Sequence, residues 1–196
     1  MDIFELAKFK KIAGGGGDND DAQSVLDALI DRKITEIESD VSLIGVNAFT
    51  ACSYLVKADF PFAEKINGSA FYSCGRLKTT NFPRVKIIYA SAFALCAELS
   101  ILDFPSATSI GGAAFQNCAK FSTLILRSEA VCTLGNVSAL SSTPISSGTG
   151  YIYVPSALIE EYKVATNWST YAAQFRALED YTVDGTTTGE LDPDKI

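Results

Sequence analysis

Histidine is absent from this 196-residue sequence, and tryptophan and methionine each occur once. Without an imidazole, the chain has no Ser-His or Cys-His catalytic pair and no zinc site that requires histidine. The sequence also has no apolar run approaching the roughly 20 residues of a membrane-spanning helix. These absences argue against the common triad hydrolases and against insertion into a membrane.

Basic residues are in the minority, because 16 Lys and Arg stand against 23 Asp and Glu, for a formal net charge of −7. Nucleic acids and anionic membranes are bound by basic patches, so we expect no nucleic-acid partner. Residues 1–5 have neither the basic start nor the long apolar core of a secretory signal. We therefore expect a chain that is cytoplasmic as synthesised and that either stays in the cytoplasm or reaches a virion or a cell surface by another route.

What the sequence does contain is a 22-residue repeat across residues 44–126. Its unit reads Ile-x3-Ala-Phe-x2-Cys-x2-Leu-x4-Phe-Pro-x-(Ala/Val)-x2. The Ala-Phe pairs are Ala48-Phe49, Ala70-Phe71, Ala92-Phe93 and Ala114-Phe115. A fixed period of about 20–50 residues is typical of a solenoid, in which each repeat contacts its neighbours.

Each unit contains one short strand. Leu102 and Phe104, for example, alternate with Ile101 and Asp103, and this period of two marks a strand with one buried face. Successive strands run in the same direction, so stacked units form a parallel ladder with a spacing of about 4.8 Å. A unit cannot bury its apolar side chains alone, so the units must stack. We expect one continuous aromatic column, made of Phe49, Phe71, Phe93 and Phe115.

Four of the five cysteines follow the repeat, and these are Cys52, Cys74, Cys96 and Cys118. Free cysteine behaves as a small apolar side chain and is often interior. Neighbouring strands bring the thiols close, but parallel Cβ vectors about 4.8 Å apart are poorly placed for a disulfide. Buried free thiols are therefore preferred over disulfides and over a metal site. Cys132 lies outside the spacing and is also expected inside.

The Ala-Phe-x2-Cys-x2-Leu core followed by an apolar-Pro pair resembles the BspA-like class of leucine-rich repeats, from about residue 34 to residue 155. The resemblance implies a right-handed arc with a concave parallel sheet. Known members are mostly bacterial surface, adhesion or uncharacterised proteins, and some are prophage-encoded, so it also implies binding rather than catalysis. The chain departs from the pattern in its short Pro-x-(Ala/Val)-x2-Ile link. The predicted fold is a repeat solenoid with a parallel β ladder on the concave face and helical N- and C-terminal caps.

The segment before the repeat divides in two. Residues 2–12 have the pattern of a short helix, and four glycines follow, so residues 1–19 are either a tether with a Gly-rich linker or a frayed terminus. Residues 20–33 carry an apolar stripe at helical spacing and predict a helical N-terminal cap. The solenoid then occupies residues 34–155.

The segment after the repeat predicts a second cap. Residues 151–154 are expected to form a strand, and residues 156–179 a helical cap with Ser156 as its N-cap. Its second helix would begin at Ser169 and face inward through Ala172, Phe175 and Leu178, while Trp168 closes the end of the solenoid. The tail, residues 180–196, is expected to be extended or disordered.

The outward-facing residues of the strands form two columns on the predicted concave face. The first is Glu36, Lys57, Thr79, Ile101 and Thr123, and the second is Glu38, Asp59, Asn81, Asp103 and Ile125. The candidate ligand-binding residues are Glu38, Lys57, Asp59, Thr79, Asn81, Ile101, Asp103 and Thr123. The second column is acidic, and stacked like charges destabilise a sheet, so a bound cation or basic partner would explain it. The alternative is a solvated face that keeps the sheet soluble.

Three functional hypotheses follow. The first is a non-catalytic binding or attachment module that recognises a protein or a glycan. The second is a structural spacer or assembly component of a phage-like particle or surface structure, with self-association through the N-terminal segment. The third, an enzyme, is weak because a packed solenoid offers no deep cleft. We predict no catalytic residues, no cofactor and no metal ligand.

Overall fold

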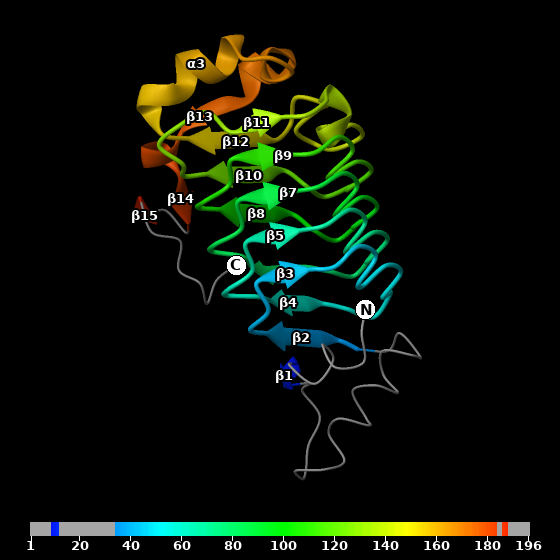
Figure 1. Cartoon of the computed structure of the whole chain (residues 1–196). Coiled ribbons are helices and arrows are strands. Elements are labelled where there is room, and N and C mark those ends of the chain that lie inside the picture. The colour runs from blue at the N-terminus through cyan, green and yellow to red at the C-terminus, as the bar shows by residue number, and fades with distance from the viewer. Residues whose placement is uncertain (1–8, 12–33, 184–185, 188–196) are drawn as a thin grey trace, which may run out of the picture.

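Stacked coils build the described part of the chain, which comprises residues 9–11, 34–183 and 186–187 of the computed structural model (Figure 1). Each of the first five coils contributes one strand to the main sheet and one to a second sheet, and β12 and β13 then extend only the main sheet. The main sheet contains β2 (Glu36–Ser39), β4 (Lys57–Asp59), β6 (Thr79–Asn81), β8 (Ile101–Phe104), β10 (Thr123–Leu126), β12 (Tyr151–Val154) and β13 (Phe175–Ala177). The second sheet contains β3 (Leu43–Ile44), β5 (Lys65–Ile66), β7 (Ile87–Ile88), β9 (Ser109–Ile110) and β11 (Thr133–Leu134). The predicted solenoid is confirmed.

All the strands within these two sheets pair in parallel. The main sheet consists of two ladders, in the orders β2-β4-β6 and β8-β10-β12-β13, whereas the second sheet is one ladder of five strands. Lys57 lies opposite Thr79, and Ile101 lies opposite Thr123. The register within each ladder is therefore the one that the two outward columns require.

The core contains the predicted aromatic column. The ring centroids of Phe71 and Phe93 are 5.2 Å apart with planes 7° apart, and Phe93 and Phe115 are 5.8 Å apart. A second stacked column, which the sequence analysis did not predict, is formed by Phe60, Phe82 and Phe104. The two columns contact each other, so each ring in the middle of the stack packs against rings of both columns.

The repeat cysteines are free and buried, as predicted. In addition, the thiols of Cys74, Cys96 and Cys118 each donate a hydrogen bond to a phenylalanine carbonyl of the preceding coil. The Cys74 Sγ lies 3.0 Å from the Phe49 carbonyl oxygen, and the Cys96 Sγ lies 3.2 Å from that of Phe71. A small side chain that also donates therefore suits this slot, because it satisfies a buried backbone acceptor.

These thiols are expected to be unreactive in the native protein. Burial raises the pKa of Cys96 well above its ordinary value and raises that of Cys132 to about 12, so little thiolate forms at pH 8. A chromogenic disulfide reagent should detect almost no thiol in the folded protein and all five in urea. Fast labelling of the native protein would contradict the buried arrangement.

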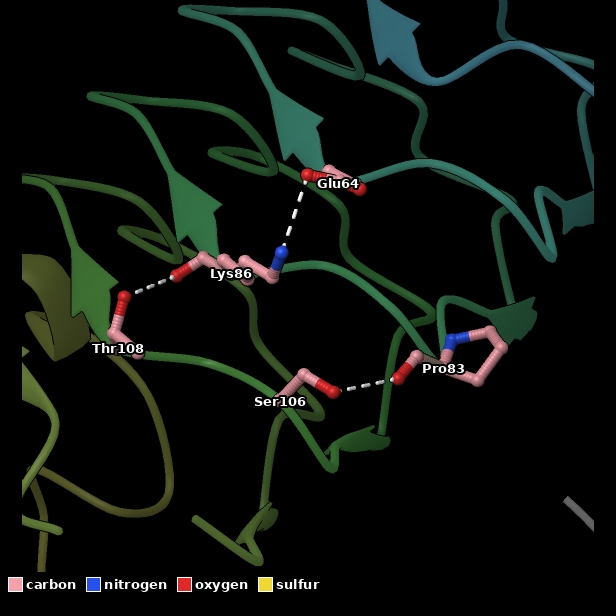
Figure 2. Close-up of polar contacts among 5 residues, drawn as sticks. All are labelled: Glu64, Pro83, Lys86, Ser106 and Thr108. Atoms are coloured by element: carbon pink, nitrogen blue, oxygen red, sulfur yellow. Dashed lines mark hydrogen bonds and ion pairs between the residues drawn. The ribbon is translucent and has the colours of Figure 1, made fainter.

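The turns between the two sheets also link successive coils, as Figure 2 shows. The Lys86 ammonium lies 3.2 Å from the Glu64 carboxylate, and the Thr108 hydroxyl donates to the Lys86 carbonyl at 3.1 Å. The Ser106 hydroxyl donates to the carbonyl of Pro83 at 3.0 Å. The ion pair is exposed and contributes little by itself. The turns of successive coils therefore stack on one another in the same order as the core side chains.

The C-terminal cap contains the 3₁₀ segments η2 (Ser156–Leu158), η3 (Trp168–Gln174) and η4 (Leu178–Asp180) and the helix α3 (Ile159–Val164). Its side chains bond the backbone of the last coil. The Cys132 N–H donates to the Tyr162 hydroxyl at 2.8 Å, and the Trp168 indole donates to the Cys132 carbonyl at 2.5 Å. Asn167 donates to the Leu134 carbonyl at 2.7 Å. These bonds replace those of a further coil, and the predicted closing role of buried Trp168 is confirmed.

Part of the predicted C-terminal cap is wrong. The segment from Ser169 is a 3₁₀ helix that ends at Gln174, and Phe175 starts strand β13 instead of continuing a helix. Pairing with β12 extends the main sheet and buries the Phe175 ring. Ser156 is not an N-cap, since it lies inside η2 and its hydroxyl donates to the Glu179 carboxylate at 3.2 Å.

The two ends of the described chain also form strands. Residues Phe9–Lys11 form β1, antiparallel to β2, so the helix predicted for residues 2–12 is wrong at these positions. The predicted cap helix, residues 20–33, and the glycine run lie outside the described residues. The described part of the tail is extended, because β14 (Thr182–Val183) pairs with β15 (Thr186–Thr187).

Candidate ligand-binding face

The N-terminal half of the main sheet carries polar side chains that remain accessible. In strands β2 and β4 buried residues face the core and the intervening ones face outward. The residues of β6 are half-buried or exposed, and Thr79 and Asn81 lie opposite the outward residues Lys57 and Asp59. We define the N-terminal face as the outward residues Glu36, Glu38, Lys57, Asp59, Thr79 and Asn81. Asp59 and Thr79 are half-buried and the other four are exposed. The Asn81 amide donates to the Asp59 carboxylate at 2.9 Å.

The C-terminal half of the same sheet is different. The Asp103 side chain is only 15% exposed, and the Arg127 Nε lies 2.9 and 3.2 Å from its two carboxylate oxygens. Burial raises the pKa of Asp103, although the Arg127 charge opposes the rise. Asp103 is therefore paired within the protein, and the predicted acidic column does not continue past Asn81 as open carboxylates.

Ile125 was placed in the outward column by its spacing, and it does alternate with core residues, but it is fully buried. The prediction that it faces the solvent is wrong. Ile101 and Thr123, in the other column, are half-buried. Ile125 lies opposite Tyr153 of β12, and the Tyr153 ring contacts Tyr181 in the chain after β13, which Figure 1 shows turning back toward β14.

A cluster of aromatic and basic side chains lies on these C-terminal strands. Tyr181 is 8% exposed, and its ring contacts that of Tyr153 edge-on at 4.7 Å. The Arg176 guanidinium lies 4.3 Å from the centre of the Tyr151 ring. We call these four residues the tyrosine-arginine cluster. This cluster was not predicted from the sequence, although Tyr151 and Tyr153 lie opposite Thr123 and Ile125 and so continue the two outward columns.

The described residues offer contact surface and no apparent catalytic centre. Among residues 9–11, 34–183 and 186–187, no group of three carboxylate or cysteine side chains is arranged to hold a metal ion. In the same part of the chain, no helix is long and apolar enough to cross a membrane. Polar side chains on a regular sheet are suited to non-covalent contact with a partner.

Comparison with solved structures shows the same fold in bacterial proteins. A leucine-rich repeat protein of Bacteroides ovatus has a TM-score of 0.54 and 23% identity over 72% of this chain and 35% of its own. The T. pallidum protein TpLRR has a TM-score of 0.50 and 21% identity over 59% and 52% of the two chains. For the pneumococcal vaccine antigen PcpA the TM-score is 0.51, with 17% identity over 73% and 40%. The chain thus spans about half or less of these proteins.

A family assignment comes from the sequence itself. No curated protein sequence matches the chain. The model of the BspA type leucine rich repeat region, however, matches residues 30–145 in six copies. Leucine-rich repeats commonly bind proteins, and this type is generally non-catalytic. Because the match covers more than half of the chain and coincides with the stacked coils, the chain belongs to the BspA-type leucine-rich repeat family.

Proposed function

We propose that this chain is a non-catalytic recognition module that binds a protein ligand through the N-terminal face. The observation that supports this most directly is the difference between the two halves of the main sheet. Glu36, Glu38, Lys57 and Asn81 are exposed, whereas Asp103 is paired with Arg127 and Ile125 is fully buried. A ligand reaches the outward side chains of β2, β4 and β6 without displacing any described residue.

The charge of this face favours a basic partner. Three carboxylates, Glu36, Glu38 and Asp59, accompany one ammonium group, Lys57. Glu38 lies directly opposite Asp59 on the next strand, and opposed like charges destabilise a sheet. A partner with Lys or Arg side chains relieves this repulsion, and the overall charge of −7 helps to attract it. The ligand is therefore a basic protein segment.

The double variant Glu38→Gln/Asp59→Asn tests this directly. On an array of immobilised basic, neutral and acidic peptides, the unchanged chain should bind the basic peptides, and less so at high salt. The double variant should bind them about tenfold more weakly, which corresponds to ~1.4 kcal/mol. The matched control Glu129→Gln/Glu161→Gln removes the same charge from exposed positions elsewhere and should change affinity less than about twofold.

Other outcomes would contradict this role. Equal weakening by the control variant would show that only net charge matters. Binding to a glycan array, with none to peptides, would assign a carbohydrate ligand instead. A stable oligomer in light scattering, lost on removal of residues 1–17 and accompanied by no ligand binding, would favour the assembly component.

A further inference from the structure

We propose a second binding site, in the C-terminal half of the main sheet, whose ligand is an acidic peptide segment with an aromatic residue. In the structure this site is filled by the chain's own residues 178–181, which act as an intramolecular ligand that a partner segment of the same chemistry displaces. The site lies apart from the N-terminal face and uses the tyrosine-arginine cluster.

The seat of Tyr181 is built from three strands of the main sheet. Tyr153 of β12 contacts its ring, and Tyr153 lies opposite the buried Ile125 of β10. Ile125 in turn lies opposite Asp103 of β8. Burial raises the pKa of Tyr181. The neighbouring Tyr153 and Asp103 add to this rise, whereas Arg127 opposes it, so the Tyr181 ring lies near the Asp103–Arg127 ion pair. The site that Tyr181 occupies therefore combines an aromatic side chain, Tyr153, with an ion pair, Asp103–Arg127.

The acidic residues before Tyr181 match the basic side of this region. The segment reads Leu-Glu-Asp-Tyr, with Glu179 and Asp180 exposed. The Glu179 carboxylate accepts hydrogen bonds from the Ser156 amide at 3.3 Å and hydroxyl at 3.2 Å. Burial raises the pKa of Tyr153. The Arg176 charge opposes this rise, whereas Tyr151 and Asp180 add to it, so both Arg176 and Asp180 act on this tyrosine. Tyrosine and arginine are also enriched where interfaces bind most strongly.

The segment is held more weakly than the strands beneath it. The strands of the main sheet are joined by backbone ladders, whereas residues 178–181 contact the coils through the side-chain interactions of Tyr181 and Glu179. The gain from burying one aromatic ring is comparable with the entropic cost of ordering a few residues. Such a segment opens at a lower free energy than global unfolding, which gives a competing peptide access.

A peptide added in trans tests the site in the full chain. The probe is the fluorescent peptide Leu-Glu-Asp-Tyr-Thr-Val, and the key variant is Tyr181→Ser. We expect the probe to bind Tyr181→Ser at least about tenfold more tightly than the unchanged chain, because the Tyr181 ring no longer occupies the site. A control peptide with serine in place of its tyrosine should not bind, and Tyr72→Ser, which removes an exposed tyrosine elsewhere, should behave like the unchanged chain.

Several results would overturn the proposal. Equal affinity of the probe for both chains would show that Tyr181 does not occupy the site, and equal binding of a peptide with lysines in place of its two acidic residues would refute the charge match. Loss of the cooperative melt in Tyr181→Ser would make the segment an integral part of the cap.

Hydrogen exchange of the unchanged protein gives a second test that needs no variant. The Tyr181 amide, which donates to the Leu178 carbonyl at 3.0 Å, should exchange at least about a hundredfold faster than the amides of Leu124 and Leu126 in β10. Equal protection would mean that the segment leaves only when the whole chain unfolds, and the proposal would then be wrong. Neither test depends on ligand binding at the N-terminal face.

Discussion

Replacing Phe93 with alanine is expected to lower the free energy of unfolding by about 3–5 kcal/mol. The Phe93 ring is completely buried and lies 5.2 Å from Phe71 and 5.8 Å from Phe115 in its own column. It also lies 5.7 Å from Phe82 and 6.3 Å from Phe104 in the second column. Truncation leaves a cavity between two coils, and the ladders above and below prevent the coils from collapsing into it.

Urea denaturation at 25 °C measures this effect, with far-UV circular dichroism for the whole solenoid and Trp168 fluorescence for the C-terminal cap. Phe62→Ala provides the matched control, since Phe62 is 44% exposed and should lose about 0.5 kcal/mol or less. Phe49→Ala, in the first described coil, should cost less than Phe93→Ala. A cost below about 1 kcal/mol for Phe93→Ala would refute the stacked column as the main source of stability.

The second large effect is expected for Gly111→Ala. A Cβ atom on Gly111 would lie 2.6 Å from the Ala90 amide nitrogen and 2.8 Å from the Tyr89 carbonyl carbon. Both are backbone atoms of the preceding coil, so no side chain can move aside to make room. The coils must separate locally, which we expect to cost about 3 kcal/mol and to lower the melting temperature by about 6–12 °C.

The repeat itself supplies the control for this variant. Gly45 occupies the same slot as Gly111, three coils earlier, and a Cβ atom there would meet none of the described residues within 4 Å. Gly45→Ala should therefore change the stability by no more than about 0.5 kcal/mol. Similar melting temperatures for the two variants would show that the close approach at Gly111 is unimportant.

The contacts that recur once per coil were predictable. The stack of Phe71 on Phe93 follows from their common slot, and so does the position of Asp59 opposite Asn81. The hydrogen bonds from Cys74, Cys96 and Cys118 were missed, although they too are periodic, because a thiol was interpreted only as an apolar group. The second aromatic column was missed for a different reason: Phe82 and Phe104 were placed on the buried face of their strands, but no stacking of their rings was predicted.

The candidate site was less predictable than the fold. Glu38 and Asp59 lie on the outward side of the sheet, as the alternation indicates, and their role as ligand-binding residues stays a prediction. Asp103 has the same slot but a different environment, because Arg127 pairs with it. Arg127 stands where Pro61, Pro83 and Pro105 stand in the earlier coils, so those coils contain no equivalent of the ion pair.

The 22-residue period determined by itself which side chains lie above one another, because a residue and its copy in the next coil occupy equivalent positions in a parallel stack. Only the tertiary structure decided which half of the main sheet stays accessible. Tyr181, in the chain that returns after β13, is buried against Tyr153, Ile125 is fully buried, and the cap side chains bond the last coil. These contacts join residues at spacings that do not repeat, so they depend on how the chain packs in three dimensions and leave no periodic signal.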